Sequence, residues 1–179
     1  MITTLPLTDM HQRHYGLPPN VIGCFLLAAR VSLDLNHSPP QEFRLEDTGL
    51  SRAVVVDWEP TNAREQAAMA NQDDATRDGA YACALAAIEV TRGLVAVRRA
   101  ERRSGVDYYL APAGQVVEDL EAAWRLEVSG TQLNEAQVRY RLSTKMQQAG
   151  AVHSDLPALA AVVGFMARLI MIREVDSTP

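Results

Sequence analysis

The sequence GVDYYL at residues 105–110 and the sequence RLEVSG at residues 125–130 each alternate their side chains with a period of two, as β-strands do. Asp107 lies near the middle of the first stretch and Glu127 near the middle of the second. If the two strands pair antiparallel, the two carboxylates lie side by side on one face of a sheet. Such a pair repels unless a cation or a proton separates the charges.

Helix and strand patterns continue on both sides of these stretches. Apolar residues at helical spacing predict helices, and Asn62 with Glu65 has the spacing of a capping box. We expect Asp73 or Asp74 to cap a long helix that ends at Gly93. The expected elements are a helix at 20–36, strands at 42–46 and 53–58, a helix from about 63, a helix at 74–91, strands at 94–100, 106–111 and 123–129, a helix at 135–149, and strands at 157–165 and 168–175.

This order of elements predicts an α/β fold with a central mixed β-sheet flanked by helices on both faces. We expect a single domain over residues 1–179, because a chain of this length buries a sufficient core by itself. Residues 1–73 are expected to form an N-terminal arm, a helix and a hairpin that extend the core. Residues 74–175 are expected to form the core, in the order helix, three strands, helix, strand.

The composition is that of a globular protein from a reducing compartment. Apolar residues make up 47% of the chain and charged residues 22%. Cys24 and Cys83 lie in apolar runs, where a free cysteine behaves as a small hydrophobic side chain. No signal peptide is apparent and the apolar runs are too short to span a bilayer, so we expect a cytoplasmic protein without membrane contact. The net charge of −5 argues mildly against a protein that coats nucleic acid.

Lys145 is the only lysine among the 17 Lys and Arg residues. In the helix at 135–149 it falls within the apolar stripe that includes Leu142, because each helical residue turns by about 100°. An ammonium that faces the sheet needs a partner, and Asp107 and Glu127 are the obvious ones. Two neighbouring carboxylates also suit a hard cation such as Mg²⁺, which would support metal-assisted hydrolysis.

The order of elements, the acid in the second core strand and the acid-x-polar sequence in the third resemble the core of the PD-(D/E)XK nuclease superfamily. The resemblance covers roughly residues 74–165, and the two quoted stretches are also similar to stretches of bacterial proteins with this kind of fold. It implies a restriction-endonuclease-like core in which Asp107 and Glu127 bind Mg²⁺ or Mn²⁺.

The superfamily has a lysine two residues after the second acid, where it helps to position or activate the attacking water. In this chain that residue is Ser129. Some members supply the lysine from the following helix, so the resemblance assigns this role to Lys145. Glu89, near the end of the preceding helix, resembles the additional helix acid that some members contribute to the metal site. The alternative for Glu89, which its position favours, is a salt bridge at the helix end.

The resemblance also implies that the substrate is a nucleic acid, whose phosphates need cationic or polar partners. Arg98 and Arg99 lie in the predicted hairpin close to the first acid, and Arg102 and Arg103 lie in its turn. We expect Arg98 and Arg99 to hold the phosphate backbone with assistance from Gln148. The alternative is that these arginines belong to a solvated turn.

A second interpretation is a catalytically silent relative that keeps the nuclease fold as a binding or assembly module. It would act as a homodimer, or with a protein partner encoded in the same bacterial defence or regulatory operon. Ser129 in place of a lysine and the negative net charge favour this interpretation. His11 and His14 have a spacing that suits two metal ligands, but no third ligand is near in the sequence, so a zinc site is not expected.

Overall fold

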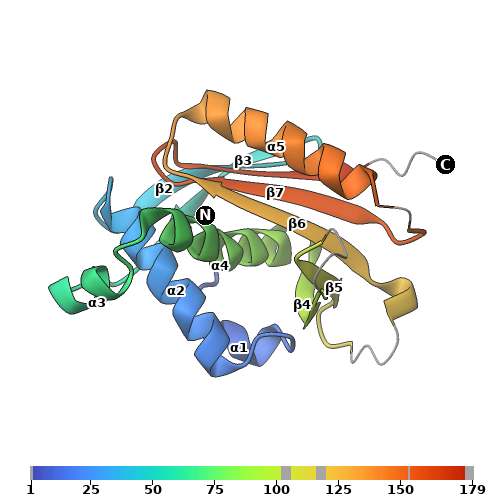
Figure 1. Ribbon diagram of the computed structural model, residues 1–179, viewed down its shortest axis with the longest axis horizontal. Helices are drawn as coiled ribbons and strands as arrows, with labels where there is room; N and C mark the ends of the chain where they lie inside the picture. The colour runs from blue at the N-terminus through green and yellow to red at the C-terminus, as the bar shows by residue number, and fades with distance from the viewer. Residues whose placement is uncertain (1, 102–105, 116–119, 153, 176–179) are drawn as a thin grey trace.

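The structure is a computed structural model that describes residues 2–101, 106–115, 120–152 and 154–175. These residues form five α-helices and one mixed β-sheet of eight strands in the order β1-β3-β2-β8-β7-β6-β5-β4 (Figure 1). Along the chain the elements are β1 (Thr3–Thr4), α1 (Met10–Arg13), α2 (Pro19–Asp34), β2 (Gln41–Asp47), β3 (Leu50–Val56), α3 (Ala63–Ala68), α4 (Gln72–Arg92), β4 (Leu94–Arg99), β5 (Tyr108–Pro112), the 3₁₀ helix η1 (Leu120–Ala122), β6 (Trp124–Thr131), α5 (Glu135–Gly150), β7 (Ala158–Gly164) and β8 (Leu169–Val175).

The predicted α/β fold with a central mixed sheet is confirmed. β4, β5 and β6 pair antiparallel in sequence, β6 and β7 pair parallel on either side of the α5 crossover, and β7 and β8 pair antiparallel. The helices and strands lie close to their expected bounds, whereas the turn predicted at 102–105 lies outside the described residues. The order α4-β4-β5-β6-α5-β7 therefore follows the expected sequence of core elements.

Alternating side chains of the central strands separate two buried layers. Leu159 and Ala161 of β7 pack with α2 and α4 in the larger core, whereas Ala158 and Ala160 pack with α5 in the smaller one. Helices α2 and α4 therefore cover one face of the sheet and α5 covers the other (Figure 1). Among the described residues, no helix combines the length and the apolar character that are needed to cross a membrane.

The N-terminal hairpin is continuous with the rest of the sheet. Strand β2 pairs antiparallel with β3 and parallel with β8, and β1 pairs parallel with β3. The segment expected to extend the core thus adds β1, β2 and β3 to the same sheet, on the side away from β5 and β6.

The start of α4 differs from the prediction. Its cap is Asn71, whose side-chain oxygen accepts hydrogen bonds from the N–H groups of Asp73 and Asp74. An asparagine oxygen satisfies these orphan donors as well as a carboxylate does, and the two aspartates then stabilise the first turn through the helix dipole. Asp73 and Asp74 consequently keep their carboxylates exposed.

Gly79 allows α4 to pack directly on the backbone of α2. A Cβ atom at this position would lie 2.7 Å from the Cα of Ala29 and 2.9 Å from the carbonyl carbon of Ala28. Backbone atoms within a packed helix cannot move aside locally, so glycine is required here. Gly23 in α2 is the opposite case, because a Cβ there would meet no atom within 4 Å.

We expect Gly79→Ala to lower the free energy of unfolding by about 1–3 kcal/mol through overpacking between α2 and α4. Gly23→Ala should raise it by about 0.5–1 kcal/mol, because alanine costs less backbone entropy than glycine in an open helical position. Urea unfolding of the two variants measures both changes in the free energy of unfolding. A Gly79→Ala variant as stable as Gly23→Ala would contradict the close contact.

Candidate functional site

The hydrogen-bond ladder between β5 and β6 ends early. The register runs to Tyr108 opposite Leu126, and the N–H of Asp107 then donates to the carbonyl of Leu126 at 2.8 Å. Strand β6 continues to Thr131 alongside β7. Within the described residues no strand pairs with the other edge of β6 beyond Leu126. Asp107 lies at this open edge, and Glu127 follows Leu126 in β6.

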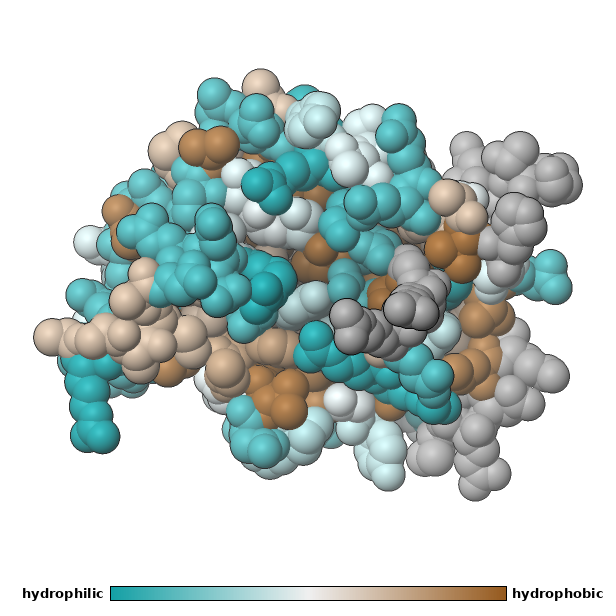
Figure 2. All heavy atoms as spheres, in the orientation of Figure 1, coloured by the Kyte–Doolittle hydropathy of each residue, from teal (hydrophilic) through white to brown (hydrophobic). Residues whose placement is uncertain are grey.

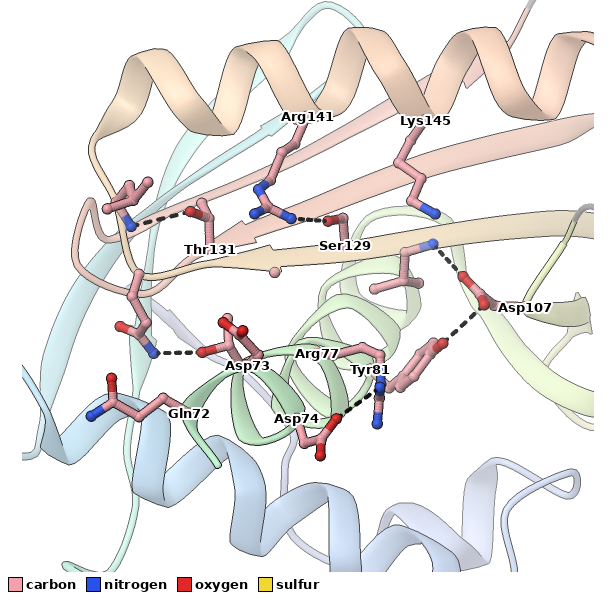
Figure 3. Close-up of a pocket in the computed structure, with 15 residues that line it drawn as sticks. Gln72, Asp73, Asp74, Arg77, Tyr81, Asp107, Ser129, Thr131, Arg141 and Lys145 are labelled. Carbon is pink, nitrogen blue, oxygen red and sulfur yellow. Dashed lines mark hydrogen bonds and ion pairs between the residues drawn. The ribbon is translucent and has the colours of Figure 1, made fainter. Parts of the chain in front are cut away.

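Asp107 occupies the place where the ladder stops. Its Oδ2 atom accepts a hydrogen bond from the N–H of Val128 at 2.8 Å, and its Oδ1 atom accepts one from the hydroxyl of Tyr81 at 2.9 Å (Figure 3). Burial and the negative charge of Asp107 both raise the pKa of Tyr81, so this hydroxyl stays protonated and remains a donor. The carboxylate is thus fixed at the edge of the sheet, between β6 and α4.

Glu127 projects from β6 toward α5, where it meets the predicted lysine. The Nζ atom of Lys145 lies 2.7 Å from Glu127 Oε2, and Glu127 is only 6% exposed. Burial raises the pKa of Glu127, the hydrogen bond and charge of Lys145 act against that shift, and the charge of Asp107 acts with it. The two acids are therefore close enough to interact, and Lys145 stabilises the ionised form of one of them.

A pocket of about 680 Å³ extends from Asp107 and Lys145 along the open edge of β6, between α4 and α5 (Figure 3), whereas Glu127 reaches it only through its contact with Lys145 and is not a lining residue. The lining residues come from all three elements and the segments next to them. They are Gln72, Asp73, Asp74, Thr76, Arg77, Tyr81, Asp107, Val128, Ser129, Gly130, Thr131, Gln132, Leu133, Arg141 and Lys145.

The two long walls of this pocket differ in charge. Arg141 and Lys145 project from α5, whereas Asp73 and Asp74 lie at the start of α4 (Figure 3). Arg77 partly neutralises the α4 wall, because it forms an ion pair with Asp74 at 3.0 Å. The α5 wall is therefore the cationic side.

The structure does not bring Glu89 to the other predicted site residues. Its carboxylate binds Arg13 at 2.6 Å and His14 at 3.1 Å, near the C-terminal end of α4. Glu89 does not line the pocket. Glu89 therefore forms ion-pair contacts near the end of the helix and does not join the predicted metal site.

The predicted phosphate contacts also lie outside the pocket lining. Arg98 pairs with Glu101 at 3.3 Å, and Gln148 is exposed on α5. The guanidinium of Arg99 lies 5.8 Å from the ring centre of Tyr81 and 5.6 Å from that of Tyr108, a cation–π arrangement at the margin of the site. Arg102 and Arg103, in the predicted turn of the hairpin, lie outside the described part of the chain.

Sequence reasoning missed Tyr81, and it placed Arg141 beside Lys145 on the polar edge of the helix without assigning it a role. Tyr81 lies within a long buried segment of α4, so its pattern indicates a core residue and nothing distinguishes its hydroxyl. Arg141 precedes Lys145 by one helical turn, and this i, i+4 spacing was the available signal that both reach the same surface. Its Nη1 atom donates to the hydroxyl of Ser129 at 3.3 Å.

The oxygen atoms at the open edge suit a hard divalent cation. Mg²⁺ needs only one or two protein carboxylates, with waters and substrate oxygens completing its shell, and each carboxylate oxygen can accept more than one interaction. Asp107 and Glu127 meet this requirement, and the carbonyl of Val128 points to the same side of β6 as its N–H. No cluster of three or more His, Cys, Asp or Glu side chains suited to a metal occurs in the described residues, so the shell would depend on water and substrate.

No family model, curated protein or solved structure matches the chain. The interpretation of the site therefore depends on its own geometry.

His14 is a buried histidine with two structural contacts. Its Nδ1 atom accepts a hydrogen bond from the N–H of Ala96 at 3.0 Å, and its Nε2 atom lies 3.1 Å from Glu89. An imidazole that accepts at Nδ1 and donates at Nε2 is neutral. Burial lowers the pKa of His14, although the hydrogen bond and charge of Glu89 act in the opposite direction. Its role is to join the N-terminal arm to β4 and α4.

We expect the free energy of unfolding to decrease as the pH falls below about 6.5, because unfolded His14 then takes up a proton that the folded form resists. This histidine can contribute up to about 1.4 kcal/mol per pH unit. His14→Gln should remove that component, whereas His11→Gln, at an exposed position, should keep it. Urea unfolding between about pH 5 and 8 checks the slopes. Equal slopes in the two variants would contradict this assignment.

Proposed function

We propose that the protein is a Mg²⁺-dependent phosphodiesterase that cleaves nucleic acid and is built on a PD-(D/E)XK-like core. The observation that carries this proposal is the 2.7 Å contact between Lys145 and Glu127, beside Asp107. The only lysine of the chain reaches a buried carboxylate next to a second one. Ionisable groups that converge in this way are typical of catalytic sites.

The order of secondary structure supports the same proposal. The elements α4, β4, β5, β6, α5 and β7 follow one another as the resemblance to the nuclease superfamily requires. Asp107 immediately precedes the second of these strands and Glu127 lies in the third. Lys145 comes from the following helix and takes the role that Ser129 cannot perform.

The protein groups have separable roles in this reaction. Asp107 and Glu127 would hold the cation, which would supply charge neutralisation for the phosphate and a more acidic water. Tyr81 and the N–H of Val128 keep the Asp107 carboxylate in place. Lys145 has three N–H donors and uses one of them on Glu127, so the others are available to orient the attacking water.

The cysteines suit a reducing compartment for this activity. Cys24 and Cys83 are both free, one exposed and one buried. Burial raises the pKa of the Cys83 thiol to about 12, so it is not a nucleophile. An unpaired, exposed Cys24 is typical of a reducing environment, which supports the proposal of a cytoplasmic protein.

A silent binding module is the second candidate. Both oxygens of Asp107 already accept hydrogen bonds from the protein, and Lys145 already neutralises Glu127. In that case the cluster would be a structural ion-pair network, and the open pocket would bind a second copy of the chain or an operon-encoded partner. Metal binding separates the two candidates.

We expect purified wild-type protein to bind Mn²⁺ and Mg²⁺ in calorimetric titrations and to cleave a labelled oligonucleotide only when one of these ions is present. Asp107→Asn and Glu127→Gln should each lower ion affinity and cleavage by about 100-fold or more, because each removes a ligand charge. Lys145→Met should lower the cleavage rate by about 10²–10⁴-fold and leave ion binding in place.

Asp57→Asn is the matched control, because Asp57 is exposed, does not line the pocket and is no part of the proposed metal shell. Thermal unfolding of each variant verifies that its fold is intact. If the wild type binds neither ion, with and without an oligonucleotide present, the hydrolase is excluded and the silent module remains.

A further inference from the structure

Arg141 stands beside the proposed catalytic groups on the cationic wall of the pocket. It precedes Lys145 by four residues, which places the two side chains on one face of α5, about 6 Å apart along the helix axis. Both side chains extend from α5 toward β6 in Figure 3. An extended ligand that contacts Lys145 with one of its groups can therefore contact Arg141 with the neighbouring group.

The guanidinium of Arg141 keeps most of its donors available. In the described residues its only hydrogen bond is to the neutral hydroxyl of Ser129, and it contacts no carboxylate. The other arginine of the lining, Arg77, is instead held by Asp74 at 3.0 Å and Asp78 at 2.9 Å. Since a guanidinium carries five N–H donors in a planar fork, Arg141 is suited to bind a phosphate through two parallel hydrogen bonds.

The open edge of β6 contributes a backbone donor to the same place. Arg125 and Thr131 bond to the β7 side, through the carbonyl of Pro157 and the N–H of Phe165. Strand alternation therefore directs the N–H of Gly130 to the other side, into the pocket. No described residue accepts this hydrogen bond, although Gly130 itself is buried against Thr76 and Ala80 of α4, an approach that a side chain at this position would prevent.

We propose that Arg141 and the N–H of Gly130 bind the phosphate next to the scissile one on a nucleic-acid strand that runs along the α5 wall. This subsite rests on the proposed phosphodiesterase function, in which Lys145 and the cation act at the scissile phosphate itself. Asp73 and Asp74 repel a phosphodiester from the opposite wall. On the side of the molecule shown in Figure 2, hydrophobic residues form small separate groups among hydrophilic ones, which suits a polar ligand.

The test measures binding of a fluorescein-labelled single-stranded DNA oligonucleotide by anisotropy in EDTA, so that neither a cation nor cleavage contributes. We expect Arg141→Gln to weaken binding about tenfold, because it removes a charge-assisted bidentate contact. The slope of log K against log salt should also decrease in magnitude by about 0.7. Arg64→Gln, which removes the same charge from an exposed position on α3, should leave both quantities unchanged. Arg141→Lys should recover the slope and only part of the affinity.

Equal affinities for Arg141→Gln and Arg64→Gln would overturn the subsite. A site that binds inorganic phosphate through Arg141 and does not bind the oligonucleotide would overturn its assignment to nucleic acid. This result can be told apart from a failure of the hydrolase proposal, since DNA binding through Arg141 in a protein that binds no Mg²⁺ or Mn²⁺ would contradict the hydrolase and retain Arg141 as a phosphate contact without a neighbouring scissile phosphate.

Discussion

The early end of the ladder between β5 and β6 is the constraint on which the candidate site depends. Because β5 stops pairing at Tyr108, the carboxylate of Asp107 replaces the next strand residue and accepts the N–H of Val128. The remainder of β6 is left with an open edge, and α4 and α5 approach it from opposite faces of the sheet. A longer β5 would pair with this edge and close the pocket.

Stability alone does not explain the charges at this edge, because a buried ion pair rarely stabilises a fold more than a well-packed apolar pair does. Burial raises the pKa of Glu127, and Asp107 adds to that effect, so ionised Glu127 opposes folding and Lys145 only offsets the cost. Functional sites commonly retain arrangements of this kind. The cluster is therefore better explained by a ligand that needs these charges than by packing.

Local sequence patterns were sufficient for the elements of the fold and for part of the site. Period-two alternation located the strands that carry Asp107 and Glu127, and helical spacing turned Lys145 toward the sheet, where its contact with Glu127 is confirmed. The patterns could not identify Tyr81, because its hydrogen bond to Asp107 exists only after α4 packs beneath β6. The same limit applies to Glu89, whose contacts with the N-terminal arm come from distant parts of the chain and removed it from the predicted metal site.

The most direct test of the account is a crystal structure of the protein with Mn²⁺, in which anomalous scattering locates the ion. The account predicts an anomalous peak at the open edge of β6, with carboxylate oxygens of both Asp107 and Glu127 at about 2.0–2.3 Å from the ion. A protein crystallised in excess Mn²⁺ that shows no peak there, with Lys145 still bound to Glu127, would contradict it and leave the cluster as a structural ion-pair network.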